Sequence, residues 1–220
     1  MRRLTPVLLA IVVACSYATA RETATVRLSP SVRLLPGPVN GVCIERDGHI
    51  VVVYGDPSGT LQQADVVLFT HSRRDVVWAG QILVERGARA IVPAAEAAAF
   101  AEPQEFWNTF VRARFHDYHQ QTTKVPVVPL RVDRSVADGD TIEWQDISVR
   151  VMGTPGYTRG AVSYLLEVDG LKYAFVGDLI YGDGQLLDLY SLQDEVSDLR
   201  IGGYHGYAAR MIQLIASLRA

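Results

Sequence analysis

Short apolar runs rich in β-branched residues alternate with segments of helical spacing along much of the chain. Two such runs, residues 42–45 and 50–54, flank Asp47-Gly48, a pair typical of a tight turn, and together they predict a β-hairpin. The continuous apolar run over residues 65–70 predicts a strand that is buried on both faces.

The pattern after this strand favours helices first and strands later. Apolar residues at helical spacing predict a helix over residues 76–86, which stops at Gly87. A short strand at 90–92 and helices over 94–102 and 103–123 follow. Beyond these we expect strands at 127–132, 141–144, 147–152, 163–168 and 173–176, and a last helix over 207–218. This order predicts an α/β or α+β sandwich.

Composition narrows the class of protein without defining it. The chain has 220 residues, of which 49% are hydrophobic and 20% charged, as in an ordinary globular domain. Its formal net charge is −3, and its basic residues are scattered, so we expect no nucleic-acid partner. Composition does not identify the substrate, which we expect to be a small molecule.

The first twenty residues resemble a secretory signal. Arg2 and Arg3 precede an apolar stretch at 7–14, and Ala18-Thr19-Ala20 has the small-x-small pattern of a cleavage site. The apolar stretch is too short for a good membrane span. We therefore expect residues 1–20 to be a signal peptide, residues 21–220 to form a single domain, and the protein to be secreted or periplasmic.

The two cysteines leave one alternative open. Cys15 follows Val12-Val13-Ala14, a sequence similar to a lipobox, so a lipid anchor at Cys15 would make the protein a membrane-anchored lipoprotein. Cys43 lies in an apolar strand-like run, and we expect a buried thiol with no role as a nucleophile.

Polar residues that suit chemistry follow three of the expected strands. His71 to Asp75 follow the strand at 65–70, Thr154 to Thr158 follow that at 147–152, and Gly177-Asp178 follow that at 173–176. Ligand sites in layered α/β folds are commonly built from such loops.

These segments, in this order, resemble the metallo-β-lactamase superfamily. The matching pieces are "GDPSG" (55–59), "THSRRDVVWAG" (70–80) and "TPGYTRGAVSYLLEVDGLKYAFVGDLI" (154–180). The resemblance covers roughly residues 40–219 and implies an α/β (α+β) four-layer αββα sandwich with mixed sheets. The last expected helix reaches the end of the sequence with neither a capping residue nor a glycine stop. We therefore expect the domain to be incomplete at Ala220, with a last strand and helix missing.

The resemblance implies a metal site whose ligands are only partly kept. His71, Asp75 and Asp178 match ligand positions of the family. Arg73 and Val76 stand where its first loop has further histidines.

Two further positions complete the comparison with the family's ligand set. Tyr157 replaces the histidine of the Thr-Pro-Gly loop. His205 precedes the last helix and has no assured counterpart among the family's ligands.

The retained residues allow opposite expectations about a metal. A catalytic zinc usually has three protein ligands, and one imidazole with two carboxylates favours harder ions such as manganese, iron or magnesium over zinc. Arg73 argues against any metal, because its guanidinium supplies a positive charge beside the carboxylates. Singly, each residue also has a structural interpretation: His71 as a hydrogen-bonded histidine, Asp75 as a helix N-cap and Asp178 as part of a turn.

Two hypotheses about function follow. In the first, a hydrolase with a reduced metal site cleaves an ester, amide or thioester, and Asp75 and Asp178 orient the site; metal analysis with and without Asp178→Ala tests it. In the second, a catalytically inactive binding or structural domain has Arg73 in place of the metal charge. The second predicts an ion pair between Arg73 and Asp75 or Asp178.

Overall fold

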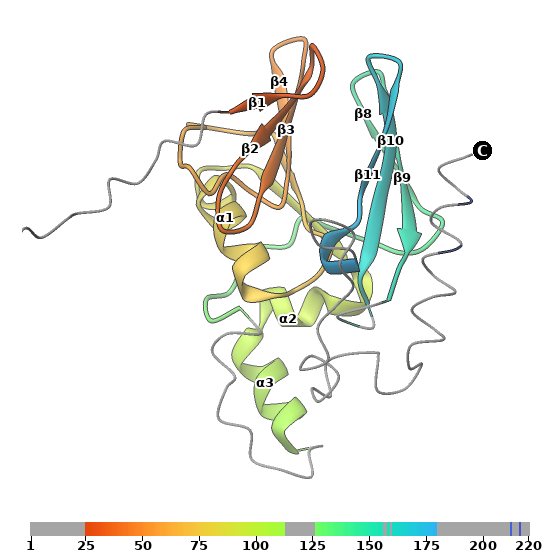
Figure 1. Ribbon diagram of the computed structural model, residues 1–220. Coiled ribbons are helices and arrows are strands. Elements are labelled where there is room, and N and C mark those ends of the chain that lie inside the picture. Colours follow the sequence, from red (N-terminus) through yellow and green to blue (C-terminus); the bar gives the residue numbers. More distant parts are fainter. Residues whose placement is uncertain are drawn as a thin grey trace, which may run out of the picture.

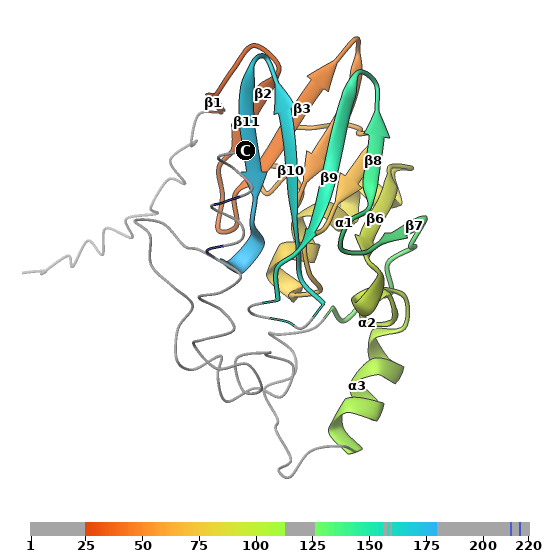
Figure 2. The ribbon, with the colours of Figure 1, turned by 90° about the vertical axis from the view of Figure 1, so that its right-hand side faces the viewer.

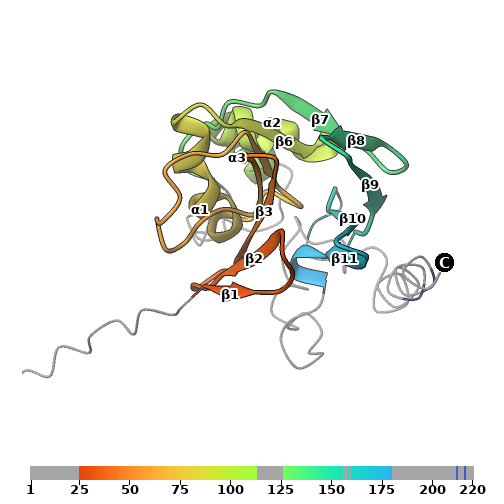
Figure 3. The same ribbon diagram turned by 90° about the horizontal axis from the view of Figure 1, so that it is seen from above.

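The protein is a sandwich of two β-sheets with helices on the outer face of the larger sheet. The computed structural model describes residues 25–112, 126–155, 158, 160–179, 212 and 216. Seen from above, α1 and α2 lie on the side of the first sheet that faces away from β8 to β11 (Figure 3). The α/β sandwich expected from the sequence is thus confirmed.

The larger sheet is mixed and has the order β1-β2-β3-β4-β5-β6-β7. Its first four strands are antiparallel, whereas β4 to β7 are parallel. The strands are β1 (Val26–Arg27), β2 (Val32–Leu35), β3 (Gly41–Arg46), β4 (His49–Val53), β5 (Val66–Leu68), β6 (Arg89–Pro93) and β7 (Arg134–Val136).

The smaller sheet is antiparallel, with the order β11-β10-β9-β8. Figure 2 shows it in front of the larger sheet. Its strands are β8 (Thr141–Trp144), β9 (Ile147–Gly153), β10 (Val162–Val168) and β11 (Leu171–Phe175), close to the ranges expected from the sequence.

Helix α1 (Arg74–Glu85) connects β5 to β6. It ends where Gly87 takes a φ of +111°, a conformation that favours glycine. The interpretation of Asp75 as an N-cap is wrong: Arg73 holds the N-cap position, no side chain caps the helix, and Asp75 lies in its first turn.

The remaining helical segments are short and follow β6 and β11. A single 3-10 turn, η1 (Ala94–Glu96), leads into α2 (Ala97–Ala101), and α3 (Pro103–Arg112) follows. A second turn, η3 (Gly177–Leu179), follows β11.

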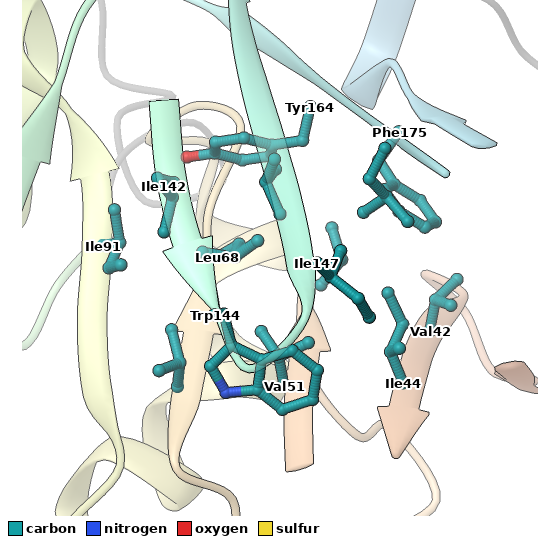
Figure 4. Close-up of a cluster of buried hydrophobic side chains, with 14 of the residues drawn as sticks. Val42, Ile44, Val51, Leu68, Ile91, Ile142, Trp144, Ile147, Tyr164 and Phe175 are labelled. Atoms are coloured by element: carbon teal, nitrogen blue, oxygen red, sulfur yellow. The ribbon is translucent and has the colours of Figure 1, made fainter. Parts of the chain in front are cut away.

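The main core lies between the two sheets (Figure 4). Tyr164 from β10 is fully buried there, and its hydroxyl donates to the carbonyl of Phe69, 2.8 Å away, so it also joins the sheets. Burying each large aliphatic side chain contributes about 1.5–3 kcal/mol. A second core lies between the larger sheet and the helices, where the rings of Phe69 and Phe100 are 5.5 Å apart.

One expected strand is wrong, and three strands, β1, β2 and β7, were not expected. Residues 127–132 form no strand, because Pro126 and Pro129 interrupt pairing and Val127 and Val128 are 57% and 51% exposed. The strand that pairs with β6 is instead β7. The unexpected strands β1 and β2 extend the antiparallel edge.

Several expectations fall on residues outside the described ones. These include the signal peptide over 1–20, most of the helix over 207–218, of which Ile212 and Ala216 are described and helical, and the second helical layer of the four-layer sandwich. Within the described part, no helix is long and apolar enough to cross a membrane. Cys43 is buried as expected, and burial raises the pKa of its thiol despite the opposing effect of Arg33.

Asp169, in the turn between β10 and β11, connects the two sheets by hydrogen bonds to the turn between β1 and β2. Its carboxylate accepts hydrogen bonds from the Ser29 hydroxyl at 2.7 Å, the Ser31 amide at 2.7 Å and the Ser31 hydroxyl at 2.9 Å. Arg46 adds an ion pair at 3.3 Å. Hydrogen bonds from the two serines, with help from Arg46, lower the pKa of Asp169.

We expect Asp169→Asn to lower the denaturant midpoint at neutral pH. Because the folded pKa of Asp169 is lowered, its stabilising contribution is complete above the unfolded carboxyl pKa of about 4 and disappears as pH falls below it. The deficit of the variant should therefore shrink in acid. Asp47→Asn, in the exposed turn between β3 and β4, is the matched control, and an Asp169→Asn deficit that is constant down to acid pH would contradict the assignment.

Candidate functional site

The candidate site lies where β5, β9 and β11 end. The loops after these strands lie at the same end of the sandwich, opposite the β3–β4 and β10–β11 turns (Figure 1). His71 follows β5, Thr154 and Thr158 follow β9, and Asp178 follows β11. The structure thus brings together the described residues of all three loops that the sequence singled out.

His71 and Asp178 form a buried pair. The Nε2 atom of His71 lies 3.4 Å from Oδ2 of Asp178, and the two side chains are 1% and 13% exposed. This separation exceeds an ordinary hydrogen bond, so their interaction is mainly electrostatic. On its other side, Nδ1 of His71 lies 2.9 Å from the hydroxyl of Thr70.

The pair changes the pKa of both residues. Burial alone would raise the pKa of Asp178, but His71 and Arg73 outweigh it and hold that pKa far below the ordinary carboxyl value. Burial alone would lower the pKa of His71, but Asp178 outweighs it and raises the pKa above the ordinary imidazole value. The cluster therefore favours an ionised carboxylate beside a protonated imidazole.

Arg73 joins both acidic residues of the expected ligand set. Its Nη1 atom forms an ion pair with Asp178, and its Nε lies 2.9 Å from Oδ1 of Asp75. The Arg73 side chain is 28% exposed. The ion pairs that the second hypothesis predicts are thus present.

The other expected site residues are placed differently. Val76 is 2% exposed, which fits an apolar contact and not a ligand. Tyr157 and His205 lie outside the described residues.

Tyr54 supports the site from β4 and was not found from the sequence. It adopts a φ of +71°, unusual for a bulky residue, and its hydroxyl accepts the amide proton of Gly177 at 2.8 Å. Gly177 is required there: its φ is +58°, and a Cβ atom would lie 2.6 Å from Oγ1 of Thr70. Backbone strain of this kind is typical of functional sites.

Glu96 was also missed. It is 6% exposed, and it contacts both the loop after β5 and the loop after β9 through Ser72 and Thr158. The available signal was a single carboxyl group within the apolar segment "AAEAAAF".

A metal ion does not fit the described residues as they are arranged. Among these residues, no three His, Cys, Asp or Glu side chains surround one point. The guanidinium of Arg73 lies between Asp75 and Asp178, so a cation already neutralises the two carboxylates.

Sequence comparisons find similarity between this chain and two hydrolases. The chain is 37% identical over 97 residues to a hydroxyacylglutathione hydrolase of Maricaulis maris, a match that covers 38% of this chain and 37% of that protein. It is 28% identical over 163 residues to the acyl-coenzyme A thioesterase MBLAC2 of Bos taurus, covering 74% of this chain and 49% of the relative. The chain thus spans about half or less of these relatives. No family model matches the chain.

Solved structures share the fold. The di-zinc class B3 metallo-β-lactamase LRA-12 from an Alaskan soil metagenome superposes with a TM-score of 0.58 at 19% identity, covering 86% of this chain and 73% of that one. The chain thus shares the metallo-β-lactamase fold, and the motif order and the sequence matches support the metallo-β-lactamase superfamily.

We expect the purified protein to retain less than stoichiometric zinc after dialysis, and Arg73→His to bind zinc more tightly. The substitution removes the competing cation and adds an imidazole beside His71. Elemental analysis and calorimetric titration measure both effects. Arg74→His is the matched control, and stoichiometric zinc in the wild-type protein would contradict the expectation.

We expect Tyr54→Phe to lower the free energy of unfolding by about 1–3 kcal/mol, because it leaves the Gly177 amide without its acceptor. Denaturant titration measures the loss. Tyr173→Phe is the control, since the Tyr173 hydroxyl is buried and has no hydrogen-bond partner among the described residues. Equal losses in both variants would disprove the assigned role.

Proposed function

We propose that the protein hydrolyses an acyl thioester. The observation that carries this proposal is its similarity to a hydroxyacylglutathione hydrolase and to an acyl-coenzyme A thioesterase. Hydroxyacylglutathione and acyl-coenzyme A are both thioesters of small thiol carriers. The charged cluster of His71, Arg73 and Asp178 at the strand ends supports the same proposal, because ligand loops of layered folds lie there.

The residues of this cluster suit the charge changes of the reaction. Hydrolysis adds water to the acyl carbon and breaks the C–S bond, releasing a carboxylate and a thiol. The carbonyl oxygen gains negative charge on the way, and a fixed cation stabilises it. We assign this role to Arg73 and assign the orientation of the attacking water to Asp75 and Asp178, which flank the guanidinium.

No step of the proposal passes through a metal, because Arg73 lies between two of the three expected ligands. The metal that the superfamily resemblance implies stays a prediction, which zinc analysis of the purified protein tests. Thioesters are more reactive toward water than amides are, so they need less activation of the carbonyl group.

The inactive-domain hypothesis is the weaker of the two. The ion pairs of Arg73 are compatible with both hypotheses, since its side chain is 28% exposed and is not fully enclosed by the protein. The sequence relatives are named as a hydrolase and a thioesterase, and these names favour catalysis.

We also propose that residues 1–20 direct export, so that the enzyme acts outside the cytoplasm. The support is the basic, apolar and small-x-small order of these residues. A lipid anchor at Cys15 stays the alternative.

We expect the full-length protein to release thiol from short acyl thioesters, as measured with a thiol-reactive dye. His71→Ala should lower kcat/KM by about 100-fold or more, because it removes one of the two positively charged partners of Asp178 and displaces the site. His49→Ala, at an exposed histidine that lies 3.4 Å from Asp65, is the matched control and should not change turnover. Binding of thioesters without turnover, or full activity in His71→Ala, would contradict the proposal.

A further inference from the structure

Glu96 is a carboxyl group in a place where the sequence otherwise puts alanine and phenylalanine. It is the last residue of η1, between β6 and α2, and is 6% exposed. Burial of a carboxylate is costly unless hydrogen bonds compensate for the lost water. The contacts of Glu96 therefore indicate why an acid is present at this position.

Each carboxyl oxygen of Glu96 accepts a hydrogen bond from a different site loop. Oε2 accepts the backbone amide proton of Ser72 at 2.5 Å, and Oε1 accepts the hydroxyl proton of Thr158. Ser72 and Thr158 are 2% and 3% exposed, so water does not compete for these bonds. Gly160 allows this approach, because a Cβ there would lie 2.6 Å from Cγ of Glu96.

We infer that Glu96 is a positioning residue that holds these two loops in register, an inference that rests on the proposed thioester hydrolysis. Ser72 lies between His71 and Arg73 in the chain, so fixing its amide sets the directions in which both neighbouring side chains leave the backbone. Thr158 belongs to the Thr-Pro-Gly loop that faces the same end of the sandwich. Glu96 thus acts on the reacting groups through the backbone and touches no substrate.

Substitutions at Glu96 can separate the effect of its hydrogen bonds from the effect of its charge. In Glu96→Gln, the amide oxygen can still accept from Ser72, while the amide nitrogen donates to the hydroxyl of Thr158. In Glu96→Ala neither bond remains. Positioning by hydrogen bonds therefore predicts that glutamine rescues what alanine loses.

The experiment measures thioester hydrolysis and amide hydrogen exchange in the full-length protein. We expect Glu96→Ala to lower kcat by about 100-fold with little change in KM, the loss typical of a small misplacement of reacting groups. The Ser72 amide should exchange faster in this variant. Glu96→Gln should keep most of the activity and of the protection, and Thr158→Val, which removes one of the two bonds, should give an intermediate loss.

Glu102→Ala, at an exposed acid shortly after Glu96, is the matched control and should change neither measurement. Denaturant titration identifies unfolded variants, and if Glu96→Ala does not fold, Glu96→Gln and Thr158→Val still decide. Unchanged kcat and Ser72 protection in Thr158→Val and Glu96→Ala would overturn the inference, as would a Glu96→Gln variant as impaired as Glu96→Ala. If the wild-type protein hydrolyses no thioester, the proposed function fails, while Ser72 exchange still reports on the hydrogen bonds of Glu96.

Discussion

Burial of the Asp178 charge is the constraint on which the candidate site depends. A carboxylate withdrawn from water needs hydrogen bonds or positive charge to compensate for the lost hydration, and for Asp178 the positive charge comes from His71 and Arg73. Arg73 is 105 positions from Asp178 in the chain, so this compensation exists only when the two sheets are packed. The site and the sandwich therefore form together, and the loop after β5 takes its conformation partly from a residue in the other sheet.

Strands and helices with a strong local pattern could be predicted from the sequence. The hairpin of β3 and β4 follows from its Asp-Gly turn and apolar strands, and Asp47 and Gly48 both adopt positive φ there. The same reasoning was wrong for residues 127–132. Their apolar pattern predicts a strand, but Pro129 within the segment and Pro126 before it have no amide proton to donate to a sheet. Strands β1 and β2 escaped prediction because their stability comes from pairing at an edge and from Asp169 in the other sheet.

Only those residues of the candidate site that follow the order of the superfamily's motifs could be predicted from the sequence. The positions of His71 and Asp178 directly after two expected strands, in the order of the superfamily's motifs, were enough to expect them near one another. Tyr54 and Glu96 could not be found in this way, because both act on backbone amides, of Gly177 and Ser72. Every residue except proline has a backbone amide, so the sequence does not show which amide a side chain accepts from, and the pairing is visible only in three dimensions.

The β3–β4 and β10–β11 turns lie at the end of the sandwich opposite the site loops (Figure 1). Gly48, in the turn between β3 and β4, has no atom within 4 Å of the position that a Cβ would occupy. That turn therefore has room for an inserted linker to a solid support, whereas the φ of +79° at Gly48 disfavours a side chain at this position itself. A protein immobilised through it would present the face with His71 and Arg73 to the solution.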